Sequence, residues 1–342
     1  MKRALLSRLC CPTCGADLRF AALDDFSSAE THDAEGGRLA CAVCKTEYPL
    51  SAGVPRLVPG ALEADAVKTR DAFAFEWSRY PGSLPEDEPI LLEESQLAAG
   101  DFRGRLVLDA GCGMGRYSIA ALALGAEVVA LDLSDALLRL AELAPQWPKL
   151  HVVQGNLLQP PLKPLQFDLV YSHGVLHHTS DTHAAFKRVA ALVKPGGHLS
   201  VWLYGRAGRY RDFATNPLRN EGGFVARHRR LAWIIVGLRH FVSDFVRVFT
   251  TRLPMRLTYA LSYVLAALGA LPLVKYLTFS VHPGFMVRVI ENFDWISPPY
   301  QWHHTKEELS RWFEDEGFEV LKVLPHGLVP KPGVLGRKRA KP

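Results

Sequence analysis

The chain has 342 residues, of which 48 % are hydrophobic and 22 % are charged, and its formal net charge is +5 at pH 7. This composition is typical of globular proteins and excludes a disordered chain, and the length predicts two or three folded units. The net charge is modest, but its placement is uneven. Between Arg206 and Arg256 the sequence holds eleven arginines against three acidic residues, so this segment is a local basic patch.

The first 60 residues are predicted to form a small metal-binding unit. They contain two Cys-x-x-Cys pairs, and each pair is a tight turn that directs two thiolates toward one point. Cys10 and His32 are alternative ligands, but the two complete pairs suffice. The predicted ligands of a structural, tetrahedral Zn²⁺ ion are Cys11, Cys14, Cys41 and Cys44.

The same cysteines and the first residues also bear on the compartment. Cys-x-x-Cys pairs in a reducing compartment indicate metal binding rather than disulfides. The sequence begins "MKRALLSRL", and Arg8 interrupts it before an apolar run of signal-peptide length can form. We therefore expect a cytoplasmic protein.

The stretches "LLSRLCCPTCGADL" and "LACAVCKTEYPLSAGVPRLVP" resemble the Trm112-like zinc-ribbon family. A unit of this size cannot bury a large core, so the metal would supply its folding energy. The resemblance also implies a docking role, because relatives of the ribbon bind RNA or a partner protein. The loop between the cysteine pairs carries Asp24, Asp25, Glu30, Asp33 and Glu35, which disfavours a nucleic-acid contact.

Residues 61–104 are predicted to be a helical linker. Phe73, Trp77 and Tyr80 recur at helical spacing on one face, a pattern that usually marks contacts with a core. From residue 105 onward, strand and helix patterns alternate, which predicts an α/β unit with a parallel sheet covered on both faces. We expect strands at residues 106–111, 127–134, 150–156, 167–174 and 197–204.

The first of these strands leads into a glycine-rich turn, "VLDAGCGMGRYSIA" at residues 107–120. Arg116 stands where a dinucleotide-binding turn needs glycine or alanine, and the Gly-Lys-Ser/Thr of a P-loop is missing. Asp109, at the mouth of the turn, would repel a phosphate across a short distance. The turn therefore predicts a ligand that carries a cationic group and no phosphate.

The spacing of the aspartate and the three glycines in this turn resembles motif I of class I S-adenosylmethionine-dependent methyltransferases, in particular the methyltransferase type 11-like domain. "FDLVYSHGVLHHTSD" and "VKPGGHLSVWLYG" resemble the same family in wording and order. The resemblance implies a Rossmann-like, seven-stranded α/β sheet built from residues 105–205 and 291–342, with S-adenosyl-L-methionine as cofactor. In similar enzymes an aromatic helix like that of residues 61–104 closes over the cofactor.

Polar and apolar residues at the strand ends give the expected cofactor contacts. Asp132 ends the second strand, from where a carboxylate can accept bonds from both ribose hydroxyls. Asn156 stands where the family generally carries aspartate, and its amide oxygen can still accept a bond from the adenine amino group. Leu133 and Leu157 would enclose adenine, and His173 would line the methionine end. The predicted cofactor-binding set is Asp109, Gly111, Gly113, Gly115, Tyr117, Asp132, Leu133, Asn156, Leu157 and His173.

Candidate catalytic residues follow the fourth strand and precede the last helix. Methyl transfer needs a base only if the acceptor arrives protonated, and histidine can take such a proton near neutral pH. In related small-molecule methyltransferases a histidine matching His178 orients or deprotonates the acceptor, so His178 is the first candidate. His177, His303 and Tyr300 are the others, and the alternative for His178 is a purely structural hydrogen bond.

Residues 206–290 exceed what the basic fold needs and are predicted to form a helical lid insertion. Residues 257–274 carry no charge and reach the lower edge of a membrane span, but Gly269, Pro272 and their place inside the domain favour buried helices instead. An apolar lid with an arginine-rich entrance suits a hydrophobic acceptor that bears an anionic group. It also suits a membrane surface, touched through residues 206–280, that delivers the acceptor.

The sequence therefore predicts a methyltransferase that acts on a small, hydrophobic molecule of secondary or lipid metabolism. Two alternatives stay open: an rRNA or tRNA methyltransferase, and a non-catalytic protein that binds the cofactor as a scaffold. Nucleic acid is disfavoured, because the basic patch lacks interleaved exposed aromatic residues and the ribbon loop is acidic. The oligomeric state and the atom that is methylated stay open.

Overall fold

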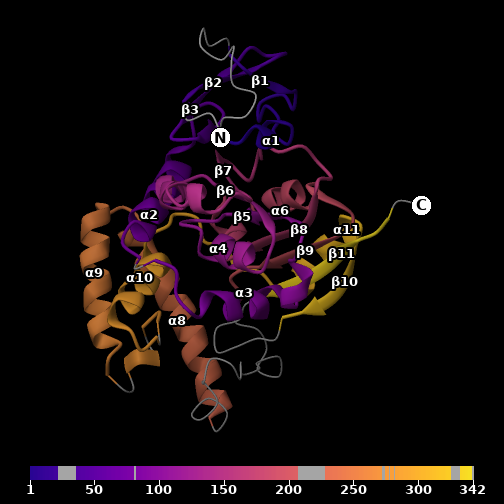
Figure 1. Ribbon diagram of the computed structural model, residues 1–342. Coiled ribbons are helices and arrows are strands. Elements are labelled where there is room, and N and C mark those ends of the chain that lie inside the picture. Colours follow the sequence, from indigo (N-terminus) through magenta and orange to yellow (C-terminus); the bar gives the residue numbers. More distant parts are fainter. Residues whose placement is uncertain are drawn as a thin grey trace.

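A computed structural model describes residues 1–21, 36–80, 82–206, 228–271, 274–276, 278–280, 282–324 and 332–340. His32 and four arginines of the basic patch lie outside these residues (Arg209, Arg211, Arg219 and Arg227). The described chain is built around one long sheet with helices on both faces (Figure 1).

The sheet has eleven strands in the order β1-β2-β3-β4-β7-β6-β5-β8-β9-β11-β10. Neighbours from β7 to β9 run parallel, and β11 lies antiparallel between β9 and β10. All five expected strands are present as β5 to β9, and the order reverses between β5 and β8, which is where such sheets bind ligands. The strands are β1 (Leu18–Phe20), β2 (Gly37–Cys41), β3 (Glu47–Ser51), β4 (Val54–Leu57), β5 (Leu106–Ala110), β6 (Glu127–Asp132), β7 (Leu150–Gly155), β8 (Phe167–His173), β9 (Val193–Trp202), β10 (Phe318–Val323) and β11 (Gly333–Lys338).

Two hydrophobic cores lie on opposite faces of this sheet. Val129 points into the first core and its neighbour Val128 into the second, because side chains alternate across a strand. The first core is covered by α1, α6 and α11, and the second by α3, α4 and α5. These helices are α1 (Arg3–Leu6), α3 (Asp87–Ser95), α4 (Arg116–Ala123), α5 (Leu138–Ala141), α6 (Thr182–Ala190) and α11 (Lys306–Asp315); short 3₁₀ helices are η1 (Ala99–Asp101), η2 (Asp135–Leu137), η3 (Ala144–Gln146), η4 (Leu176–His178) and η7 (Val274–Tyr276).

The amino-terminal ribbon is continuous with the main sheet. Strand β4 pairs in parallel with β7, with Arg56 opposite Gln154 and Leu57 opposite Gly155. The same hydrophobic core runs from the ribbon into the α/β unit. Because β4 covers the edge of β7, the ribbon satisfies backbone groups that would otherwise form an open sheet edge. The sequence predicts the ribbon, but not this pairing.

The insertion contributes α8 (Arg229–Thr250), α9 (Met255–Leu268) and α10 (Phe285–Ile296). They lie together beside the sheet, next to α2 (Ala64–Trp77), which belongs to the linker (Figure 1). Phe75 of α2 packs on Phe293 of α10, with ring centroids 5.6 Å apart. The helical character predicted for the insertion is therefore present in its described part.

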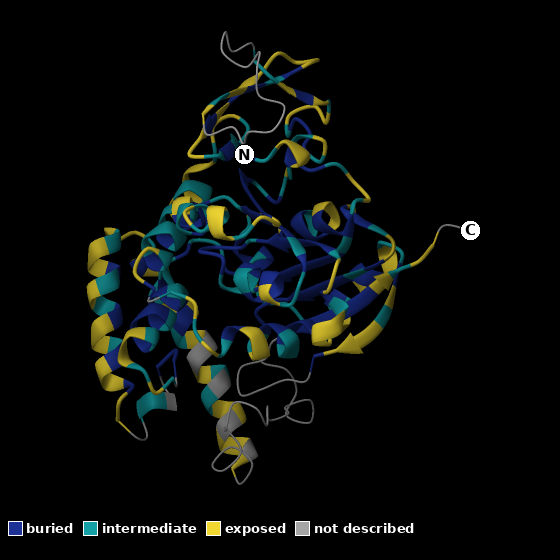
Figure 2. Cartoon of the chain, in the orientation of Figure 1, coloured by how far each residue is buried: buried dark blue, intermediate teal, exposed yellow. Residues whose placement is uncertain are grey.

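Helix α9 is shorter and more exposed than the uncharged segment 257–274 predicts. It ends at Leu268, with Gly269 as its C-cap. A helix of this length rises about 21 Å, short of the roughly 30 Å of a bilayer core. Of its residues only Thr258, Ser262 and Ala266 are buried, and its outer face is exposed (Figure 2). Among the described residues, no helix combines the length and the hydropathy that crossing a membrane requires.

Candidate active site and metal centre

The four predicted zinc ligands converge in the ribbon. All four sulfur atoms lie within 4.8 Å of one another. Cys11 Sγ is 3.6 Å from Cys44 Sγ, and Cys14 Sγ is 3.4 Å from Cys41 Sγ. A tetrahedral zinc ion with sulfur ligands at about 2.3 Å sets its sulfurs about 3.8 Å apart. The set therefore fits Zn²⁺, and Cys10, although buried, is not part of it.

Groups around the cysteines orient their sulfur atoms. The amides of Val43 and Cys44 each donate to Cys41 Sγ at 3.4 Å. The Tyr48 hydroxyl lies 3.3 Å from Cys11 Sγ and 3.0 Å from the Thr13 hydroxyl. Outer contacts of this kind fix metal ligands in place.

The glycines of the turn at 107–120 permit close packing of the surrounding fold. Gly111 has φ +94°, and a Cβ there would meet Val175 Cγ1 at 2.3 Å. Gly115 has φ +88°, and a Cβ there would meet Leu140 Cδ1 at 2.5 Å. These two glycines let the loop after β8 and the helix α5 lie directly against the turn. Gly115 itself does not line the cavity that the turn borders.

Gly113 joins the turn to β6 and α2. Its amide donates to Asp132 Oδ2 at 2.8 Å, while the amide and hydroxyl of Ser134 donate to Asp132 Oδ1 at 2.7 Å each. A Cβ at Gly113 would lie 3.2 Å from Trp77 Nε1. Burial raises the pKa of Asp132, and the donors from Ser134 and Gly113 oppose that rise. The carboxylate is thereby held in one orientation at the carboxyl end of β6.

A cavity of about 890 Å³ opens at the carboxyl ends of β5 to β9. Its volume is in the range of small-molecule sites. The described residues around it come from the glycine turn, the linker helices α2 and α3, and the insertion helix α10. Nine of the ten predicted cofactor residues line it: Asp109, Gly111, Gly113, Tyr117, Asp132, Leu133, Asn156, Leu157 and His173.

Asp109, Asn156 and His173 also make internal contacts. Asp109 is almost fully buried and accepts a bond from Ser118 Oγ at 2.6 Å, and burial raises its pKa to about 7. Asn156 Oδ1 accepts from the amide of Leu158 at 2.9 Å, which leaves one of its lone pairs for a ligand. His173 Nε2 lies 2.9 Å from the Ser200 hydroxyl. A direct contact of Asp109 with a cationic ligand stays a prediction.

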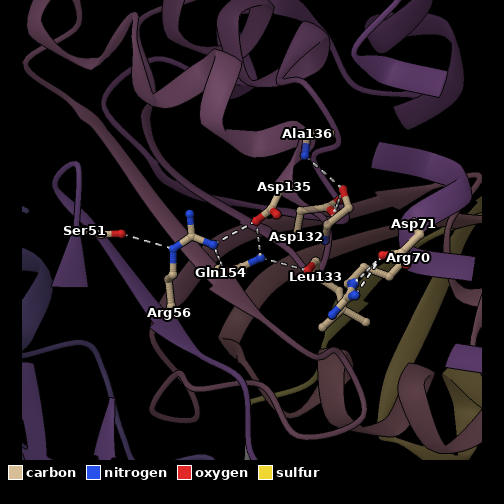
Figure 3. A network of polar contacts seen from close by, with 10 residues as sticks. Ser51, Arg56, Arg70, Asp71, Asp132, Leu133, Asp135, Ala136 and Gln154 are labelled. Carbon is tan, nitrogen blue, oxygen red and sulfur yellow. Dashed lines mark hydrogen bonds and ion pairs between the residues drawn. The ribbon is translucent and has the colours of Figure 1, made fainter. Parts of the chain in front are cut away.

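A polar network ties the ribbon to the Leu133 side of the cavity (Figure 3). Arg56 Nη1 donates to Asp135 Oδ1 at 2.8 Å and to Gln154 Oε1 at 2.9 Å. Gln154 Nε2 in turn donates to the backbone carbonyl of Leu133 at 3.1 Å. The loop after β6 is therefore held by a residue of strand β4, which no sequence motif indicated.

His178 lies on the cavity wall in a defined protonation state. Its Nδ1 is 2.8 Å from the carbonyl oxygen of Tyr300. A carbonyl only accepts, so Nδ1 carries the proton and Nε2 presents a lone pair. Burial lowers the pKa of His178 to about 3, so the ring is neutral at physiological pH. Nε2 has no hydrogen-bond partner among the described residues and lies 3.8 Å from Asp294 Oδ1.

The other catalytic candidates divide into two groups. Tyr300 lines the cavity, and its hydroxyl lies 3.2 Å from Glu63 Oε2. His177 is fully buried, with Nδ1 accepting from the Tyr204 amide at 3.3 Å, and it does not line the cavity. His303 does not line it either. The structure thus brings His178 and Tyr300 to the cavity and leaves the other two behind its wall.

Sequence reasoning missed several polar residues of the cavity. Glu76 comes from α2, Glu94 from α3 and Asp294 from α10. Glu94 accepts from Trp202 Nε1 at 2.8 Å and from the Tyr117 hydroxyl at 3.0 Å. No spacing signal links these positions, because more than half of the chain separates the first from the last.

Comparison with known proteins identifies the central part of the chain. Residues 108–201 match the family described as "Methyltransferase domain". This match begins in β5 and ends in β9, and it includes the glycine turn, Asp132 and His178. The ribbon, the linker and the insertion lie outside it.

Curated relatives match a similar region. A ubiquinone biosynthesis O-methyltransferase of Bordetella avium is 35 % identical over 126 residues, which are 34 % of this chain and 48 % of that protein. A malonyl-[acyl-carrier protein] O-methyltransferase of Pseudescherichia vulneris is 40 % identical over 98 residues, which are 29 % of this chain and 38 % of that protein. The chain therefore spans about half or less of the length of these relatives.

A solved structure with overall resemblance is the 1,6-didemethyltoxoflavin-N1-methyltransferase of Burkholderia thailandensis, with bound 1,6-didemethyltoxoflavin and S-adenosylhomocysteine. It is 17 % identical, and the alignment covers 90 % of this chain and 100 % of that one with a TM-score of 0.45. The fold assignment rests instead on the strand order and on the matched domain.

The neutral state of His178 predicts an acid-dependent loss of stability. Its pKa is about 3 in the fold and about 6.5 in an unfolded chain, so between these values only the unfolded state binds the proton and stability falls as pH falls. Between pH 6.5 and pH 5 this histidine should cost about 2 kcal/mol. Urea unfolding at both pH values should show a smaller acid loss for His178→Gln than for the wild type, and equal losses would contradict the assignment.

Metal removal should affect the whole fold, because the ribbon shares a core and a strand pairing with the main sheet. Metal analysis of the purified protein should find zinc, and Cys14→Ser should reduce its content and lower the temperature of a single, cooperative unfolding transition. Cys10→Ser is the matched control and should keep its zinc. Zinc loss in the Cys10 variant with retention in the Cys14 variant would reverse the ligand assignment.

Proposed function

We propose that this chain, which contains a class I methyltransferase domain, transfers a methyl group from S-adenosylmethionine to a small, largely apolar molecule. The observation that carries the proposal is the convergence of the glycine turn, Asp132 and His178 on one cavity. When bound, the cofactor supplies an electrophilic methyl group on a positively charged sulfur. The chain's own residues would bind it, exclude water and hold the acceptor in line.

The cofactor side of the cavity suits an adenosine group. Asp132 offers one free lone pair on Oδ2, which accepts a single bond from Gly113, whereas Oδ1 already accepts two bonds from Ser134. Leu133 and Leu157 supply apolar surface on the same side. Trp77, close above Gly113, supports the hypothesis that the linker helix α2 covers the cofactor.

The acceptor side is formed by the insertion and by the loop after β8. Phe279, Trp295 and Tyr204 line it and stack on one another, which supports a partly apolar acceptor. We propose that His178 Nε2 faces the acceptor and orients it by accepting a hydrogen bond. A ring with a pKa of about 3 is a weak base at neutral pH, which favours this orienting role over proton removal.

Replacing Asp132 tests cofactor binding. Calorimetry should show that the wild type binds S-adenosylhomocysteine and neither NAD nor ATP. Asp132→Asn should weaken that binding by roughly 10-fold to 100-fold, because hydrogen bonds to a charged group contribute about 1.5–3 kcal/mol. Asp315→Asn, an exposed aspartate of α11 outside the cavity lining, is the matched control. Tight NAD or ATP binding without S-adenosylhomocysteine binding would overturn the proposed function.

We also propose that the insertion touches an anionic membrane surface. Along the described part of α8, exposed apolar residues recur at intervals of three and four residues: Leu231, Ile234, Leu238, Phe241, Phe245 and Val248. Val242 and Val246, on the other side of α8, pack against the protein. This surface is positively charged, because it exposes Arg230, Arg252 and Arg256 and one acidic residue, Asp244. An exposed apolar stripe with flanking cations suits negatively charged lipid.

The exposed aromatic residues of α8 correct one sequence-based argument. The basic patch was expected to lack them, yet Trp233, Phe241, Phe245 and Phe249 are exposed. This argument against an RNA substrate therefore falls. RNA binding becomes an outcome to be measured alongside lipid.

Vesicle flotation tests the surface. The protein should float with phosphatidylglycerol-containing vesicles at low salt, and less with pure phosphatidylcholine, because the arginines need an anionic partner. The double variant Phe241→Ser/Phe245→Ser should lose flotation. Leu321→Ser, an exposed apolar residue on β10, is the control and should keep it. Failure to float, or salt-sensitive RNA binding in its place, would contradict the membrane proposal.

A further inference from the structure

Three carboxylates meet on the side of the cavity formed by α2 and α10. Glu76 is supplied by α2, and Glu291 and Asp294 lie one turn apart on α10. All three line the cavity. The matched methyltransferase domain ends at residue 201 and includes none of them.

Glu76 is the most unusual member of this group. It is 3 % exposed, and its Oε2 has no hydrogen-bond partner among the described residues. Burial, and then the negative charges of Asp294 and Glu291, raise its pKa well above the ordinary value. A buried acid with like-charged neighbours and an unpartnered oxygen costs stability, and a ligand that donates to it would remove part of that cost.

The neighbouring groups on this wall mostly accept hydrogen bonds. His178 presents the unprotonated Nε2, as its Nδ1 proton is given to the Tyr300 carbonyl. The hydroxyl proton of Tyr204 is already donated to Asp294 Oδ2, at 2.5 Å. A ligand that carries several N–H donors would satisfy these acceptors. A carboxylate or phosphate brings only acceptors of its own and would find few donors on this wall.

The ionisable groups of the lining are mostly acidic. Of its described residues only Arg70 and Arg116 are basic at all pH values, and they are paired with Asp71 and Asp87. Arg247, a cation outside the lining that interacts electrostatically with Asp294, donates to the carbonyls of Pro298 and Pro299. The acidic residues of the lining number eight: Glu76, Glu86, Glu93, Glu94, Asp109, Asp132, Glu291 and Asp294.

Aromatic rings complete the wall beside the carboxylates. Phe73 meets the ring of His178 edge-on, with centroids 4.9 Å apart. Tyr204 stacks on Trp295 at 5.0 Å. Aromatic faces attract cations as well as apolar groups, and this attraction grows when water is excluded.

We propose that the acceptor is an amine whose positively charged or N–H-bearing group binds between Glu76 and Asp294, with its apolar body against Phe73, Tyr204 and Trp295. This inference rests on the proposed function and deepens it by naming the substrate class. It replaces the expectation of an anionic acceptor, which was based on arginines at the entrance of the insertion rather than on the lining of the cavity.

Matched probes test the class of acceptor without knowledge of its identity. Tryptamine, tryptophol and indole-3-propionate share one ring system and differ in the charge of the side chain, as do phenethylamine, 2-phenylethanol and 3-phenylpropionate. Calorimetry with each probe is run on the full chain, with and without saturating S-adenosylhomocysteine. At least one amine should bind at least about tenfold more tightly than its alcohol, and more tightly still than its carboxylate, as expected for charge-assisted hydrogen bonds.

Glu76→Gln identifies the group responsible. It should abolish the preference for the amine, leave the affinity for S-adenosylhomocysteine unchanged, and keep or raise the melting temperature, because glutamine cannot ionise beside the two neighbouring acids. Asp294→Asn is the second variant, and should reduce the preference independently if the first does not fold. Glu88→Gln, an exposed acid of α3 outside the lining, is the control and should behave as the wild type.

The outcomes separate this inference from the proposed function. Absence of S-adenosylhomocysteine binding would defeat the proposed function. If S-adenosylhomocysteine binds but the alcohols bind as tightly as the amines, or no amine binds, the inference is overturned alone. It is also overturned if Glu76→Gln weakens the binding of S-adenosylhomocysteine instead, since the carboxylates would then hold the cofactor's own ammonium. A variant that is less stable but keeps its preference for the amine would overturn it as well.

Discussion

The contacts of Gly113 join three of the elements that border the cavity. Its amide holds Asp132 at the end of β6, and its lack of a side chain lets Trp77 of α2 approach the glycine turn. One residue therefore joins the turn, the second strand of the parallel series and the linker helix. The reversal of strand order between β5 and β8 places this junction at the sheet edge where a ligand can enter.

The ribbon is part of the same sheet as the α/β unit. Because β4 continues the sheet beyond β7, the metal centre stabilises an edge strand of the α/β unit as well as its own small fold. Arg56 extends this link to Leu133 through Gln154 (Figure 3). A structural change in the ribbon can thus alter the Leu133 side of the cavity in two ways, through the pairing of β4 with β7 and through the polar contacts of Arg56.

The insertion has two faces with different character. Its α10 side turns Glu291, Asp294 and Trp295 into the cavity, where they meet Glu76 of α2. Its α8 and α9 side turns apolar residues to solvent (Figure 2). Fold families of this kind keep the cofactor edge and vary the surrounding elements, so the chemistry of the acceptor is expected to reside in these parts. An acidic, aromatic wall inside and an apolar, basic surface outside are consistent with an amine that reaches the cavity from a lipid surface.

The sequence by itself determined the five parallel strands, the four convergent cysteines and nine of the residues that line the cavity. These features depend on local periodicity, on fixed spacing or on the ends of consecutive strands, all of which can be recognised in the sequence. The pairing of β4 with β7, the packing roles of Gly111 and Gly115, the position of His177 behind the wall and the exposed stripe of α8 were decided only by tertiary structure. So was the meeting of Glu76 with Asp294, because a buried cluster assembled from helices more than two hundred residues apart depends on how the helices pack, and no local pattern records that.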